Sequence, residues 1–115
     1  MTIDLSDYNY YIRPGFTDMR KGPCSLAGLV SSEMGHDPYD RSVYLFCGRS
    51  RKTIKALAWD GTGWLVLTKR LVVEGTFRWP QGQEECVGLD VGQLAGLLRG
   101  NDVFRSFTPW DRSAV

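Results

Sequence analysis

The sequence is poor in the residues from which metal sites and disulfides are built. It has one histidine, His36, and three cysteines, Cys24, Cys47 and Cys86, and no C-x-x-C pair. A structural zinc site draws four Cys or His ligands from short paired spacings, which scattered single residues do not supply. We therefore expect no metal and no cofactor. An odd number of cysteines without a secretion signal favours a reducing compartment.

Long apolar runs and an N-terminal targeting signal are also missing. No stretch approaches the roughly 18 charge-free apolar residues of a membrane span. The first seven residues carry Asp4 and Asp7 instead of an apolar signal-peptide core. We expect a soluble, cytoplasmic protein with no membrane partner.

Catalytic signatures are absent as well. A nucleophilic triad would have to use His36, which lies in the loop-like run 34–38. There is no nucleophile elbow, Walker A loop or G-x-G-x-x-G. The carboxylates Asp18, Asp60 and Asp90 could be read as a metal-binding triad, but each also has a turn or helix-cap explanation. We expect no catalytic residues and no enzymatic activity.

The chain does have enough apolar material for a folded domain. Its 115 residues are 43% hydrophobic and 12% aromatic, which excludes intrinsic disorder, and a chain of this length can bury a core without disulfides. We expect residues 1–115 to form a single domain. The tail 101–115 is expected to dock in part, through Phe104, Phe107 and Trp110.

Two hydrophobic periodicities predict the secondary structure. A helical period predicts a helix over residues 23–34, with Gly22 at its N-cap and Gly35 just after its end, and Asp90 is typical of the N-cap of a second helix. A period of two predicts strands at residues 8–13, 43–47, 53–59, 64–69 and 76–79, and a polar loop follows at 81–85. The fold class is therefore α+β, an antiparallel β-meander of about four to five short strands with two flanking helices.

The charge of the chain is unevenly distributed. The net charge is +1, but residues 41–79 contain eight basic and two acidic residues, a balance of +6. The remainder contains six basic and eleven acidic residues, a balance of −5. Ten of the 14 basic residues are arginines, and the planar guanidinium binds phosphate in a bidentate manner.

The loop that holds Arg49, Arg51 and Lys52 is the first candidate for a phosphate contact. Three cations within four residues repel one another unless an anion lies nearby. Five further cations are expected to support this loop in binding nucleic acid: Lys55, Lys69, Arg70, Arg20 and Lys21.

The pair Arg20 and Lys21 precedes the first predicted helix, where the helix dipole disfavours cations. A phosphate held between these side chains and the free N–H groups of the helix would explain them. The structural alternative is that Asp18 caps a first turn and pairs with Arg20 or Lys21.

Aromatic residues alternate with the cations of the basic segment. They are Tyr44, Phe46, Trp59, Trp64, Phe77 and Trp79. On an exposed sheet face they would stack on bases. They are equally explained as core residues of a small domain.

The order of short motifs resembles one family. The first motif contains Thr17, Asp18, Arg20, Lys21 and Gly22, the second is Trp59-Asp60-Gly61, and the third ends in Trp79-Pro80. Together with Lys69-Arg70-Leu71 they resemble the TnpB accessory proteins, encoded by the second open reading frame of insertion sequences of the IS sixty-six type. The resemblance covers roughly residues 10–100.

The resemblance implies a small bacterial protein that assists transposition and has no known catalytic residues. Its expected partners are the transposase of the same element and DNA. The leading hypothesis is a non-enzymatic accessory protein that binds DNA or a DNA–transposase complex through the basic sheet face and loop. The alternative is a protein-interaction module that docks on the transposase without contacting nucleic acid.

Overall fold

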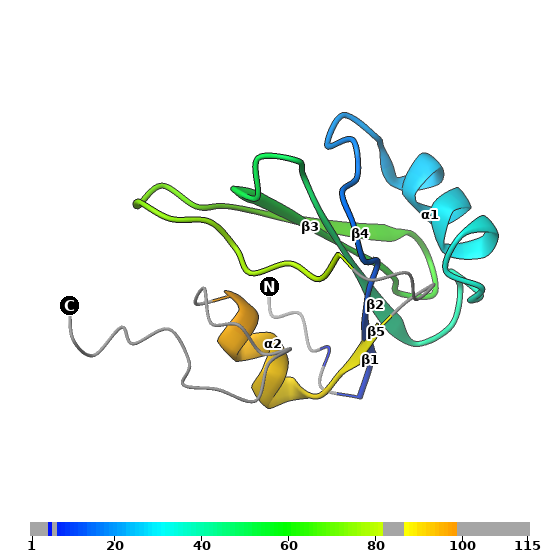
Figure 1. Cartoon of the computed structure of the whole chain (residues 1–115). Helices are drawn as coiled ribbons and strands as arrows, with labels where there is room; N and C mark the ends of the chain where they lie inside the picture. Colours follow the sequence, from blue (N-terminus) through cyan, green and yellow to red (C-terminus); the bar gives the residue numbers. More distant parts are fainter. Residues whose placement is uncertain (1–4, 6, 82–86, 99–115) are drawn as a thin grey trace.

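Two helices and a five-stranded sheet form the fold (Figure 1). The computed structural model describes residues 5, 7–81 and 87–98. The elements in chain order are β1 (Asn9–Ile12), α1 (Pro23–Ser32), β2 (Ser42–Cys47), β3 (Thr53–Trp59), β4 (Trp64–Arg70), β5 (Val87–Leu89) and α2 (Val91–Leu98). The α+β class predicted from the sequence is confirmed. In the described part of the chain, no helix is long and apolar enough to cross a bilayer.

The sheet has the strand order β4-β3-β2-β1-β5. Strands β2, β3 and β4 form the predicted antiparallel meander, with Tyr44 opposite Leu57 and Leu57 opposite Val66. The first pair differs from the prediction, because β1 runs parallel to β2. A parallel neighbour requires a crossover, and the 12–42 connection, which contains α1, provides it. Strand β5 then closes the far edge, antiparallel to β1.

The predicted strand at residues 76–79 is wrong, because this segment pairs with no strand of the described sheet. Its alternating side chains Phe77 and Trp79 are both buried in the core. Single hydrogen bonds hold the segment instead: the Phe77 N–H donates to the Arg51 carbonyl at 2.7 Å, and the Trp79 indole N–H donates to the Arg13 carbonyl at 2.9 Å. The alternation of apolar residues in this segment therefore reflects the burial of every second side chain, and the segment forms no strand-to-strand hydrogen-bond ladder.

Helix α1 begins where the sequence predicts, with Gly22 at the N-cap and Pro23 at the first position. It ends at Ser32, two residues before the predicted end. Gly35 then reverses the chain in the left-handed region (φ +69°), and the His36 N–H donates to the Val30 carbonyl at 3.1 Å.

Helix α2 has Asp90 at its N-cap, as its sequence predicts, and in the structure the cap is reciprocal. The Gln93 N–H donates to Asp90 Oδ1 at 2.7 Å, and the Asp90 N–H donates to Gln93 Oε1 at 3.0 Å. This capping box satisfies two backbone donors at the start of the helix. The predictions for the polar loop 81–85, apart from Gln81, and for the tail 101–115 lie outside the described residues.

Both faces of the central strands are covered, and β2 is buried along its whole length. The α1-side core consists of Leu26, Ala27, Val30, Met34, Tyr44, Phe46 and Leu57. The α2-side core consists of Tyr10, Ile12, Val43, Leu45, Cys47, Ile54, Ala58, Phe77, Trp79 and Leu97. Edge strand β4 differs from these strands, because its residues 66–70 are exposed.

Cys47 and Cys24 should differ sharply in reactivity. Burial raises the pKa of the Cys47 thiol to about 12, whereas Cys24 is exposed. Since the thiolate is the nucleophile, we expect iodoacetamide at pH 8 to modify Cys24 readily and Cys47 only when the chain unfolds. Mass spectrometry of a Cys86→Ser variant with and without urea measures this. Equal labelling of both thiols in the native protein would contradict the buried position of Cys47.

Candidate phosphate-binding groove

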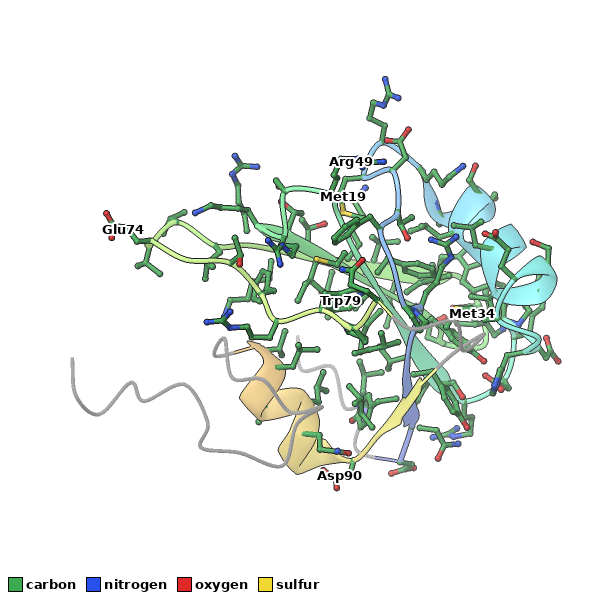
Figure 2. All side chains as sticks on the ribbon, in the orientation of Figure 1. Met19, Met34, Arg49, Glu74, Trp79 and Asp90 are labelled. Atoms are coloured by element: carbon green, nitrogen blue, oxygen red, sulfur yellow. The ribbon has the colours of Figure 1, made fainter. Side chains whose placement is uncertain are left out.

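A groove of about 510 Å³ opens where the motif after β1 meets the loop between β2 and β3. Its lining residues are Phe16, Thr17, Asp18, Met19, Gly48, Arg49, Ser50, Thr53 and Arg70. We call it the Arg49–Arg70 groove. Three segments that are distant in sequence therefore build one site, and Figure 2 shows Met19 and Arg49 next to each other at its edge.

The loop between β2 and β3 is held by its backbone. The Gly48 N–H donates to the Thr53 carbonyl at 3.1 Å, and the Arg51 N–H donates to the Gly48 carbonyl at 2.9 Å. Arg51 adopts a left-handed conformation (φ 60°) to close this turn. A side chain at Gly48 would meet Met19 Cγ at 2.7 Å, so the absence of a side chain at Gly48 lets the Met19 side chain pack against the loop in this position.

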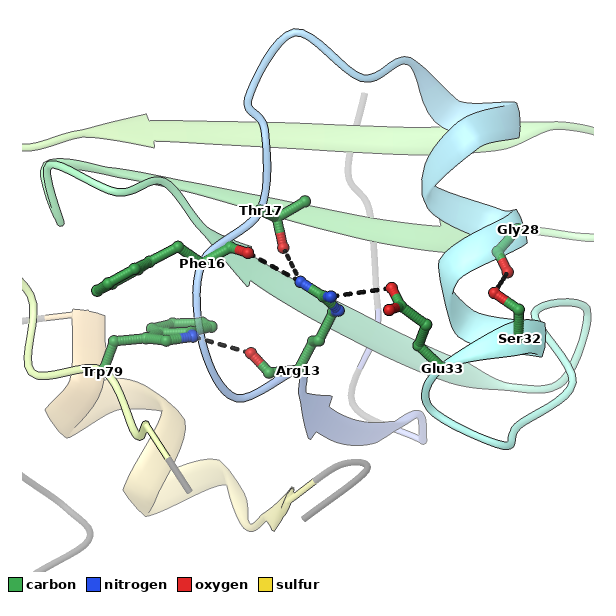
Figure 3. Close-up of polar contacts among 7 residues, drawn as sticks. All are labelled: Arg13, Phe16, Thr17, Gly28, Ser32, Glu33 and Trp79. Carbon is green, nitrogen blue, oxygen red and sulfur yellow. Dashed lines mark hydrogen bonds and ion pairs between the residues drawn. The ribbon is translucent and has the colours of Figure 1, made fainter. Parts of the chain in front are cut away.

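Arg13 positions the first motif beside that loop (Figure 3). Its Nη1 donates to the Phe16 carbonyl and to Thr17 Oγ1, both at 2.9 Å, and its Nη2 pairs with Glu33 Oε2 at 2.9 Å. The Thr17 N–H in turn donates to the Cys47 carbonyl at 2.8 Å. Arg13 thus connects the end of β1, the motif and the end of α1. The sequence analysis did not single it out, because Phe16 and Thr17 are near it in sequence but its contacts with Glu33 and Trp79 span 20 and 66 residues.

Arg49 and Arg70 carry the positive charge of the groove lining. Arg49 and Arg70 are both exposed, and among the described residues neither forms an ion pair. In strand register Arg70 lies opposite Thr53, and Lys55 lies on the same face two residues further along. Lys55 Nζ donates to the Lys21 carbonyl at 3.3 Å. Lys55 of β3 and Arg70 of β4 thus both lie on the α1 side of the sheet.

Asp18 is the one carboxylate in the groove lining, and Arg20 neutralises it. The two side chains form an ion pair at 2.8 Å, and the Arg20 N–H also donates to Asp18 Oδ1 at 2.9 Å. The hydrogen bond from the Arg20 side chain, followed by that from its backbone, holds the pKa of Asp18 well below its usual range. Of the two alternatives left open by the sequence, the structure contains the pair between Asp18 and Arg20.

The eight cations selected from the sequence do not form a single patch. Lys69 points to the other side of the sheet, where its Nζ donates to the Leu98 carbonyl of α2 at 3.0 Å. Lys52 Nζ donates to the Val73 carbonyl at 3.4 Å. Arg51 is exposed, but it does not line the groove. Arg49 and Arg70 do line it, and Arg20, Lys21 and Lys55 lie around it.

Of the two interpretations of the aromatic residues that the sequence left open, the structure has the core interpretation for most of them. Tyr44, Phe46, Phe77 and Trp79 belong to the two cores. Trp59 and Trp64, paired across the hairpin, are half-buried with ring centroids 4.9 Å apart.

Tyr39, which the sequence reasoning missed, packs 5.1 Å from each of these indole rings and is 59% exposed. The Tyr39–Trp59–Trp64 cluster is the exposed aromatic surface near β4. No local pattern marks Tyr39, because its partners lie beyond residue 58 in the sequence.

The three candidate carboxylates do not form a metal site. Asp60 Oδ1 accepts the N–H groups of Thr62 at 2.9 Å and Gly63 at 2.8 Å, and these bonds lower the pKa of Asp60. Asp90 caps α2, as described above. Within the described ranges, no cluster of three potential metal-ligating side chains occurs.

The family described as "IS66 Orf2 like protein" matches residues 8–106 of the chain. The chain belongs to this family. This confirms the resemblance drawn from the motifs, and membership indicates an accessory protein of IS66-type transposition.

Two relatives come from Sinorhizobium fredii (strain NBRC 101917 / NGR234). The chain is 38% identical over 92 residues to "Uncharacterized protein y4hO", covering 80% of this chain and 79% of the relative. It is 28% identical over 85 residues to "Uncharacterized protein y4jC", covering 74% of this chain and 72% of the relative. No solved structure matches the chain.

Several of the residues that carry the family resemblance hold the backbone in place. One of them lies beside the groove, and others lie away from it. Thr17 is 5% exposed and bound to Arg13. Gly61 turns the β3–β4 hairpin with φ +101°, and Trp79 fastens the segment before Pro80 to Arg13. These residues of the family pattern hold the scaffold, whereas its Arg70 lines the groove beside Arg49, and neither arginine forms an ion pair among the described residues.

Replacing Arg13 by Met should destabilise the fold. The Phe16 carbonyl and the Thr17 hydroxyl would lose their donor, and we expect the free energy of unfolding to fall by about 1–3 kcal/mol. Urea denaturation measures this change. The matched control is Arg41→Met, which removes an ion pair to Asp7 that is exposed on both sides, and should cost less than about 1 kcal/mol. Equal losses in the two variants would show that Arg13 does not join these segments.

Proposed function

We propose that the protein is a non-enzymatic accessory protein of transposition that binds DNA, with the Arg49–Arg70 groove as its phosphate contact. The observation that carries the proposal is the pair of exposed guanidinium groups, without ion pairs among the described residues, on a concave surface. An exposed arginine without an ion pair stays hydrated, so it costs the folded protein little free energy. It forms bidentate hydrogen bonds when it binds a phosphate.

The surroundings of the groove favour an extended polyanion over a small acidic ligand. Arg20, Lys21 and Lys55 lie around its rim, so positive charge continues beyond the cavity itself. The lining carboxylate of Asp18 is already engaged by Arg20. Phosphate contacts of this kind are independent of base sequence, and the burial of most aromatics leaves little surface for stacking on bases near the groove.

DNA binding should weaken when the two groove arginines are removed. We expect Arg49→Gln with Arg70→Gln to weaken binding of a duplex from the element's end by about tenfold per lost contact. The slope of log K against log salt should fall by about 2. Fluorescence anisotropy over a salt series measures both quantities.

The matched control for that experiment is Arg41→Gln with Arg78→Gln. It removes the same total charge from two exposed arginines that do not line the groove. A salt slope that falls equally in both double variants would mean that only overall charge matters. A wild-type chain with no affinity for duplex DNA at low salt would overturn the proposal.

The second candidate function is docking on the transposase of the same element without DNA contact. The Tyr39–Trp59–Trp64 cluster favours it, because exposed aromatic clusters are typical centres of protein interfaces. Tyr39 is 59% exposed, so its replacement should leave the fold intact.

Tyr39→Ala should weaken co-purification with the transposase in the presence of nuclease, while leaving DNA anisotropy unchanged. Truncation of a central aromatic anchor typically weakens an interface by 2 kcal/mol or more, which is about thirtyfold in Kd. The control is Arg49→Gln with Arg70→Gln, which should leave transposase binding unchanged. Retained binding by Tyr39→Ala would exclude the cluster as the docking site.

A further inference from the structure

The outer edge of β4 is a second surface, which meets the groove at Arg70. Strand β4 is the last in the sheet order, and its seven residues run from Trp64 to Arg70. Two of its large apolar side chains are exposed, Leu67 at 50% and Val66 at 36%. Figure 1 shows the strand running along one side of the sheet.

Alternate backbone groups of β4 point away from β3. The hairpin is closed by the Asp60 N–H, which donates to the Gly63 carbonyl at 3.1 Å, and bonded pairs alternate along an antiparallel ladder. In the observed register Leu65, Leu67 and Lys69 therefore bond to β3. The groups of Trp64, Val66, Thr68 and Arg70 face outward, and no other described segment hydrogen-bonds to them.

This edge lacks the usual protection against pairing. Edge strands are normally shielded by charged side chains, proline or a bulge. Residues 64–68 of β4 are Trp-Leu-Val-Leu-Thr, with no charge and no proline. Its two charges, Lys69 and Arg70, stand together at one end.

We propose that two copies of this chain pair antiparallel through their β4 edges, about a twofold axis at Leu67. In this register Val66 lies opposite Thr68 of the second copy, and the outward backbone groups of both strands form about eight hydrogen bonds. The two Leu67 side chains meet at the axis and cover each other.

The distribution of charge favours the antiparallel orientation, and the exposed Leu67 and Val66 favour a partner strand that is apolar in its middle, as a second copy of this chain is. Antiparallel pairing places each cationic end, Lys69 and Arg70, across from the neutral end, Trp64 and Leu65, of the other copy. Parallel pairing would place the cations side by side. An acidic strand from another protein would complement only one end and would leave the exposed Leu67 without an apolar counterpart.

Such a dimer is isologous, with the same edge used twice. Its twofold axis is perpendicular to the continuous sheet that the two copies form. Both copies therefore turn their α1 sides, with the Arg49–Arg70 grooves, in the same direction. The inference rests on the edge of β4 alone and does not depend on DNA binding.

The first test is the oligomeric state of the purified chain without DNA. Analytical ultracentrifugation over a wide concentration range should show a reversible dimer. Val66→Pro should give a monomer, because it removes an outward N–H and blocks the edge without breaking a bond to β3. The matched control Val72→Pro changes a residue that is 89% exposed outside the strand, and should leave the dimer intact.

The second test fixes the register and does not rely on a proline. In a Cys24→Ser, Cys86→Ser background, Leu67→Cys places two thiols across the axis, about 4.5 Å apart at Cα, within the range that a disulfide bridges. Mild oxidation should give a covalent dimer. The control Thr68→Cys places the thiols on a diagonal, about 7–8 Å apart, and should crosslink much more slowly.

Three outcomes overturn the proposal. They are a wild-type chain that is monomeric at every concentration, a dimer that survives Val66→Pro in a chain whose circular dichroism spectrum is native, and equal crosslinking rates at residues 67 and 68. If Val66→Pro does not fold, the crosslinking comparison decides alone.

Discussion

The Arg13 side chain connects the segments that build the candidate site. Its guanidinium bonds to Phe16, Thr17 and Glu33, while its carbonyl receives the indole N–H of Trp79. A single residue after β1 therefore fixes the motif, the end of α1 and the segment before Pro80. The planar guanidinium suits this position, because it offers five N–H groups in a rigid fork. Thr17, which Arg13 binds, lies two residues before Met19, whose side chain packs against Gly48 in the groove lining.

Because the central strands of the sheet are buried, the charged side chains of the basic segment lie mainly in loops and on the more exposed strands. With α1 and α2 on opposite faces, β2 is buried throughout, and the basic segment 41–79 places its charges in the β2–β3 loop, on β3 and β4 and on the segment after β4. The net charge of +1 is the sum of a basic segment 41–79 and an acidic remainder of the chain. Lys69 and Lys52 bond to carbonyl groups of the segments beside them, whereas Arg49 and Arg70 remain exposed.

Features that depend on neighbouring residues were predictable from the sequence, and features that depend on distant ones were not. The start of α1 at Gly22-Pro23 and the cap at Asp90 are local, and the structure has both. The parallel pairing of β1 with β2 and the addition of β5 depend on contacts between distant segments. The alternation of Phe77 and Trp79 led to the wrong prediction of a strand. Alternate side chains can be buried by contacts with distant segments without any hydrogen-bond ladder to a neighbouring strand. For the site, the loop cation Arg49 was found by charge alone, but the role of Arg13 and the exposure of Tyr39 follow only from the tertiary structure.

The electrostatic character of the groove should respond to salt and very little to pH. Guanidinium groups stay protonated throughout the physiological range, and Arg20 holds the pKa of Asp18 low, so that this carboxylate stays ionised and paired far below neutral pH. No histidine lines the groove. None of the residues that line the groove therefore switches its charge near neutrality, and Arg49 and Arg70 carry the positive charge of the lining. Counterion release on phosphate contact is then the main term that changes the affinity of the groove with solution conditions. Ionic strength, and not pH, therefore governs what this surface can bind.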